Sequence, residues 1–237
     1  MRGILRVVTL ALVLNADRLL QPQASQPTQP LNPSGSYPDE RDIVKRLQAA
    51  LSSTEYAVRL YFHGVCGADG GSDLQFPQVE VLAPEGNTHG VSAIREMFRN
   101  DKNVMISVEP SNIVRITIGP VYKPILDTRL SSVKLPTTAQ FNPGGPGGAI
   151  DVLESATPVQ EAMRENLVHQ EPAFYIGLEQ PPSRKGHHLP SSMGNLSLDQ
   201  ALDAVAKAFP GIVVYGECEN HGKGHTVDIK FDWYQSR

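Results

Sequence analysis

Two segments of this chain repeat the same order of elements, although they share few residue identities. Aligning Ala93 with Ala201 places apolar residues on apolar residues through a short helix and the strand after it, and brings Glu109 onto Glu217. Each segment predicts an amphipathic helix, a strand and a return strand. Such a recurring order is typical of an internally duplicated α/β unit. We therefore expect two related units, whose matching positions mostly build a core.

The repeated order extends over both halves as helix, strand, loop, helix, strand, strand. The first half predicts helices at 39–52 and 88–98 and strands at 56–62, 79–82, 104–108 and 114–118. The second predicts helices at 157–167 and 197–209 and strands at 173–178, 212–215 and 227–231. Thr157 with Gln160, and Ser197 with Gln200, have the pattern of capping boxes, which are expected to start the two later helices.

These elements predict an α+β fold of two related modules, each a small sheet covered by two helices. The first module is expected at 39–119 and the second at 157–237. The connecting segment, 120–156, predicts a strand near Arg129 to Leu135 and a hinge rich in glycine and proline from Asn142 to Gly148. A phosphate-binding loop is excluded there because no Lys-Ser/Thr pair follows the glycines.

The amino terminus has the pattern of an export signal. Arg2 and Arg6 precede a short apolar run, Val7 to Leu14, which is too short to span a membrane. We predict a signal peptide over 1–16, with Ala16 or Ala24 as the cleavage site; the alternative is an apolar helix. Residues 17–38 are predicted to be a disordered tether rich in Gln and Pro. The mature protein is therefore expected to be periplasmic or secreted, without a transmembrane span.

Charge and motifs narrow the function classes. The net charge is −4 and lysine and arginine form no cluster, which argues against nucleic-acid binding. No Gly-x-Ser-x-Gly motif occurs and neither cysteine has a base close to it in sequence, so we predict no enzyme activity and no catalytic residues. Aromatic residues pair along predicted strands, Tyr61 with Phe62 and Trp233 with Tyr234. One of each pair is expected to face outward as an anchor for a protein partner.

The chain has two cysteines, Cys66 and Cys218, one in each predicted module. In an exported protein a lone pair can form a disulfide, which would tie the modules together across a long loop. The alternative is two unpaired thiols.

A zinc site is the competing interpretation for Cys218. Cys218, His221 and His225 have the spacing Cys-x2-His-x3-His, and His187-His188 could approach them. One thiolate and several imidazoles can hold zinc tetrahedrally. A zinc-binding protein or a small zinc-dependent enzyme, with Cys218, His188, His221 and His225 as ligands, is therefore the alternative. A solvated hairpin tip explains the same polar residues without any metal.

One run also resembles a known family. Gly194-Asn195-Leu196-Ser197-Leu198-Asp199-Gln200-Ala201-Leu202, continuing to Gly211-Ile212-Val213-Val214-Tyr215, resembles the short N-terminal module of secretins and TonB-dependent receptors. The second helix-strand unit of that module and any β-barrel or secretin domain are missing here. The resemblance implies an envelope protein that docks other proteins, and it carries no catalytic residues. We expect an exported binding or scaffold protein of the cell envelope that needs no cofactor.

Overall fold

The computed structural model describes residues 38–51, 55–67, 74–83, 88–135, 145–170, 188–220 and 226–235. All of them fall within one compact unit, Leu31–Arg237. The predicted signal peptide and nearly all of the tether lie outside the described residues, as do the predicted strand at 173–178 and the first residues of the predicted hinge. None of the helices in the described part is long and apolar enough to cross a lipid bilayer.

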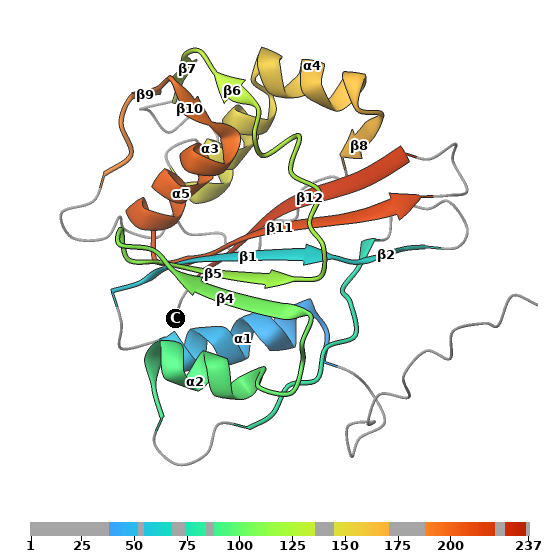
Figure 1. The fold of residues 1–237 in the computed structure, drawn as a ribbon. Coiled ribbons are helices and arrows are strands. Elements are labelled where there is room, and N and C mark those ends of the chain that lie inside the picture. The colour runs from blue at the N-terminus through green and yellow to red at the C-terminus, as the bar shows by residue number, and fades with distance from the viewer. Residues whose placement is uncertain are drawn as a thin grey trace, which may run out of the picture. The chain divides into compact units, whose positions relative to one another are not determined.

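Among the described residues, six strands form one mixed sheet, which Figure 1 shows between two layers of helices. In spatial order they are β4 (Val104–Val108), β5 (Ile113–Ile118), β1 (Ala57–His63), β11 (Gly211–Asn220), β12 (Thr226–Gln235) and β8 (Val168–Gln170). The mixed α/β character expected from the sequence is confirmed, but the expectation of two separate small sheets is wrong. β1 and β11 pair in parallel from Val58 with Ile212 to His63 with Glu217, so the two halves share one ladder of hydrogen bonds. Pairing satisfies backbone groups that two separate sheets would leave at open edges.

The two halves of the sheet have the same pairing pattern. β5 lies between β4, to which it is antiparallel, and β1, to which it is parallel. β12 lies between β11, to which it is antiparallel, and β8, to which it is parallel. In each half, therefore, the strand that comes last in the sequence lies in the middle. This strand is β5 in the first half and β12 in the second.

Helices cover both faces of the sheet. α1 (Glu40–Leu51) and α2 (Gly90–Met97) enclose one apolar cluster, in which Ile43, Leu47 and Ile94 are fully buried. α3 (Pro146–Glu154), α4 (Thr157–Glu165) and α5 (Leu198–Ala208) enclose the other. Figure 1 shows the two helix layers on opposite sides of the strands. The predicted hinge ends at Pro146, since proline is favoured in the first turn of a helix and α3 begins there.

Because helices cover both faces of the sheet at β1 and β12, the predicted outward aromatic anchors do not occur there. Tyr61 is 5% exposed, Phe62 0% and Trp233 4%, and Tyr234 is only half-buried. Alternation along a strand leaves one face in water only where no helix packs on it. Phe62 belongs to one apolar cluster and Tyr61 to the other.

In the described part of the chain, three short two-stranded pairs accompany the large sheet. β2 (Val65–Cys66) pairs with β3 (Leu74–Gln75), β6 (Arg129–Leu130) with β10 (Leu196–Ser197), and β7 (Val133–Lys134) with β9 (Ser192–Met193), all antiparallel. The single strand predicted near Arg129 to Leu135 is thus two short ones. The strand predicted at 79–82 is not formed, although Leu82 donates a backbone hydrogen bond to Met97 at the end of α2.

Candidate functional site

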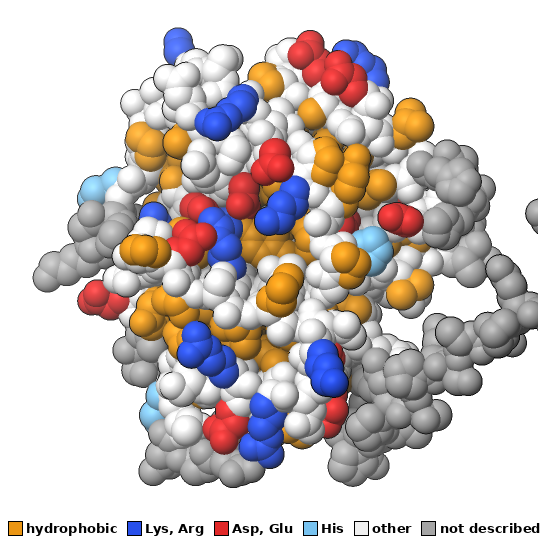
Figure 2. Space-filling view, viewed as in Figure 1, with side chains coloured by type: hydrophobic (Ala, Val, Ile, Leu, Met, Phe, Trp, Pro, Cys, Tyr) orange, Lys and Arg blue, Asp and Glu red, His pale blue; other side chains and the backbone are white. Residues whose placement is uncertain are grey.

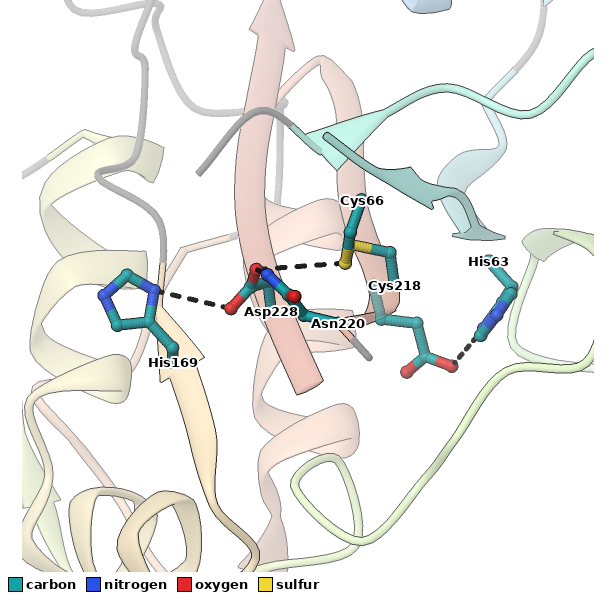
Figure 3. The surroundings of a disulfide bond; sticks show 7 residues. His63, Cys66, His169, Cys218, Asn220 and Asp228 are labelled. Carbon is teal, nitrogen blue, oxygen red and sulfur yellow. Dashed lines mark hydrogen bonds and ion pairs between the residues drawn. A yellow bond between two sulfur atoms is a disulfide. The ribbon is translucent and has the colours of Figure 1, made fainter. Parts of the chain in front are cut away.

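The two cysteines lie together at one end of the sheet and form a disulfide (Figure 3). Cys66 belongs to β2 and Cys218 to β11; their Cα atoms are 5.4 Å apart although 152 positions separate them in the sequence. The backbone N–H of Gly64 donates to the carbonyl of Glu217, which holds β2 against β11. A side chain at Gly64 would meet the carbonyl oxygen of Gln75 at 2.2 Å, so this close approach requires glycine.

The structure brings together only part of the predicted zinc site. Cys218 is 1% exposed and bonded to Cys66, and a disulfide sulfur offers no thiolate to a metal. His221 and His225 lie outside the described residues. His188 is exposed, ahead of β9. A carboxylate oxygen of Asp228 is within 4.8 Å of both sulfurs, so the disulfide, if reduced, would leave two thiols beside a carboxylate.

Two histidine–carboxylate pairs flank the disulfide, as Figure 3 shows. On one side Nδ1 of His169 lies 3.6 Å from Oδ1 of Asp228. Oδ2 of Asp228 accepts a hydrogen bond from Nδ2 of Asn220 at 3.1 Å and lies 3.8 Å from Sγ of Cys66. Asp228 is 1% exposed, whereas the His169 side chain is 58% exposed. Asp228 is therefore a buried carboxyl group beside the disulfide, and its partner His169 reaches solvent.

The second pair forms where β1 and β11 pair at their carboxyl ends. Nδ1 of His63 lies 3.2 Å from Oε1 of Glu217, which is fully buried. The hydroxyl of Tyr215 donates to Oε2 at 2.9 Å, and the backbone N–H of Tyr122 donates to Oε1. Burial raises the pKa of the Glu217 carboxyl, while these hydrogen bonds favour the ionised form and oppose that shift. The network fixes the segment after β5 against β11.

A third polar cluster connects α5 to the sheet. The Arg59 side chain is fully buried and donates to Asp203 at 2.7 Å and to Asp199 at 3.0 Å. Arg115, its neighbour on β5, also donates to both aspartates and to Glu109. The hydroxyl of Tyr61 donates to Asp199 at 2.8 Å. Arg59 and Arg115 thus face three carboxylates. These ion pairs compensate the cost of burying the charge of Arg59 on β1.

The sequence contained a signal for these clusters that no motif carries. Charged residues occur inside strands, as in Arg59 of β1, Glu217 of β11 and Asp228 of β12, and the structure buries all three. Since buried charges are almost always paired, each such residue predicts a partner in space. Their partners could not be named, because they come from distant segments.

Beside the arginine–aspartate cluster the sheet is not covered by helices. α5 contacts β1 and β11, and α3 contacts β12, whereas β4 and β5 extend beyond these helices. We define the open face as Met105 and Ser107 of β4 with Arg115 and Thr117 of β5. They lie on the same side of the sheet as Tyr61 because their registers match. Met105 is 62% exposed and Ser107 is exposed. Figure 2 shows basic, acidic and apolar side chains close together on the face turned to the viewer.

Searches found no matching family model, no matching curated protein and no matching solved structure.

Proposed function

We propose that this chain is an exported, non-enzymatic binding or scaffold protein of the cell envelope and that it contacts another protein through the open face. The observation that carries the proposal is Met105, an apolar side chain left 62% exposed beside strands β1, β11 and β12, which α5 and α3 cover. Apolar surface rimmed by polar side chains marks protein interaction sites, and methionine is enriched in them.

The charges next to Met105 suit a protein partner. The Arg115 side chain is 18% exposed, that of Asp199 27% and that of Glu109 36%, so each charge is oriented by its neighbours and still reaches solvent. Arginine is enriched at protein interfaces. Charges of both signs that are held in place and partly exposed mainly determine which partner binds, through complementary charge on that partner. Their contribution to the affinity is smaller.

We further propose that the two halves are related modules, as the sequence predicts. The support is that β1, α2, β4 and β5 follow the same order and pairing as β8, α5, β11 and β12. β4 and β11, which the sequence alignment places on each other, occupy equivalent places in their halves. The resemblance of the segment around α5 to the docking module of secretins and TonB-dependent receptors favours the same role.

Site-specific photo-crosslinking tests the partner surface. A photoreactive amino acid at Thr117, on the open face, is expected to give one discrete adduct with another protein in the native envelope. The same probe at Arg46, exposed on α1 on the far side of the sheet, is the matched control and should give none. The adduct at Thr117 should disappear when Met105 is replaced by aspartate. No adduct at Thr117, or equal adducts at both positions, would count against the open face.

Export is tested separately. Sequencing the amino terminus of the native protein is expected to show that residues 1–16 at least have been removed, because a basic start followed by a short apolar run is read as a signal. Replacing Leu10 and Leu12 with arginine should abolish both removal and export, since the apolar run would be interrupted. An intact Met1 on protein in the cytosolic fraction would refute the proposed location.

A further inference from the structure

β4 is an edge strand whose outer backbone groups pair with no other strand among the described residues. The N–H of Gly119 donates to the carbonyl of Asn103, and the N–H of Glu109 donates to the carbonyl of Ile113, both at 2.9 Å. Odd-numbered residues of β4 therefore bond to β5, and the N–H and C=O groups of Ile106 and Val108 point away from the sheet. No segment in the described part of the chain pairs with this outer edge.

The edge also lacks the usual protection against pairing. β4 has the sequence Val-Met-Ile-Ser-Val, with no charged residue and no proline, and Val108 is 39% exposed. Natural edge strands are commonly protected by lysine, proline, a bulge or shortness. At the opposite edge, the described part of β8 has three residues. β4 is therefore the edge of this sheet that is available for strand addition.

The strand is complementary to a copy of itself. If two β4 strands pair antiparallel about Ile106, Ile106 faces Ile106 of the second copy and Val104 faces Val108. The outward-pointing backbone groups then meet in about four N–H···O bonds between the copies. All three apolar side chains lie on one face of the strand, so each would contact another β-branched side chain across the junction.

We propose that the outer edge of β4 pairs with β4 of a second copy, antiparallel and centred on Ile106, so that two six-stranded sheets become one. The arrangement is a closed two-fold dimer because it uses the free edge of both copies. β11, which holds the place of β4 in the other half, has its corresponding edge paired with β1. This inference goes beyond the proposed partner surface, since it concerns the edge of the sheet rather than its open face.

Sedimentation equilibrium on the purified mature protein, from about 1 µM to about 1 mM, tests the pairing over the range expected for a small interface. The expected result is a monomer–dimer equilibrium with no larger species. Amide hydrogen exchange at Ile106 and Val108 should slow as the dimer forms. Ile106→Pro should weaken dimerisation at least about tenfold, because it removes an outward N–H while the inward bonds to β5 remain.

Val168→Pro is the matched control. The N–H of Val227 donates to the carbonyl of Leu167, so the backbone of Val168 points away from β12 on the opposite edge. This variant should dimerise normally. If Ile106→Pro fails to fold, Val108→Lys replaces it, since that side chain is already exposed. A protein that stays monomeric at the highest concentration overturns the proposal. Loss of association in Val168→Pro, or growth beyond a dimer, would instead indicate head-to-tail pairing of β8 with β4 and also overturn it.

Discussion

Replacing both Cys66 and Cys218 with serine is expected to lower the free energy of unfolding by about 5 kcal/mol. The disulfide closes a loop of 152 positions, and the entropy that a cross-link removes from the unfolded chain grows with loop length. Urea unfolding of the mature protein and of the double variant, both under non-reducing conditions, measures the difference. The bond also holds β2 against β11, so amides of β2 and β3 should lose protection against hydrogen exchange first.

A free-thiol count and metal analysis on the same protein distinguish the disulfide from the zinc interpretation. Native protein should contain no titratable thiol, and Cys66→Ser should leave the content of bound zinc unchanged. Wild-type protein treated with a dithiol reductant is the control, because it should lose stability by a similar amount without any change in sequence. Two free thiols with stoichiometric zinc that is lost in His221→Ala would favour the zinc-binding protein over the scaffold.

Replacing Glu154 with glutamine is expected to remove a marked pH dependence of stability. Glu154 ends α3, is 3% exposed and accepts a hydrogen bond from Nε2 of Gln170, while its Oε1 has no hydrogen-bond partner among the described residues. Burial, reinforced by the charge of Asp151, raises its pKa from 4.5 to about 8. The folded protein therefore binds a proton that the unfolded chain releases between these two values.

The sign of the effect follows from that difference in proton binding. As the pH rises from 4.5 to 8, the wild type loses stability from this group, about 1.4 kcal/mol for each pH unit, and above pH 8 the loss is complete. Glu154→Gln should match the wild type near pH 4 and exceed it by about 5 kcal/mol at pH 9. Urea unfolding at pH 4, 7 and 9 checks this. Glu161→Gln, on the exposed side of α4, is the control. A constant difference between Glu154→Gln and wild type across this range would contradict the assignment.

Most helices and strands could be predicted from the sequence because their signals are local. Apolar residues at helical spacing indicated α1, α2 and α5, and the capping box of Ser197 and Gln200 is formed at the start of α5. The strand predicted at 79–82 failed because it rested on a few apolar residues. Val79 is buried, but burial there comes from loop packing rather than from a ladder of hydrogen bonds.

The candidate site was less predictable because its residues come from distant segments. The cysteine count restricted Cys66 to one possible partner, so the disulfide could be anticipated from the chain alone. Asp199 and Asp203 carried no comparable signal. They resemble ordinary solvent-facing residues of an amphipathic helix until α5 is placed over Arg59 and Arg115.

The order of elements, their repeated pattern and the two residues that can form a disulfide could be read from the chain alone, since each depends on spacing or residue count. Three features emerged from the tertiary structure alone. β1 and β11 join the halves into one sheet, helices pack on both sides of its central strands, and β4 is an edge with no strand beside it among the described residues. The physical reason is that strand pairing uses backbone groups that every residue has. Side-chain patterns predict where strands occur and which face is apolar, but carry little information on which strand becomes the neighbour of another.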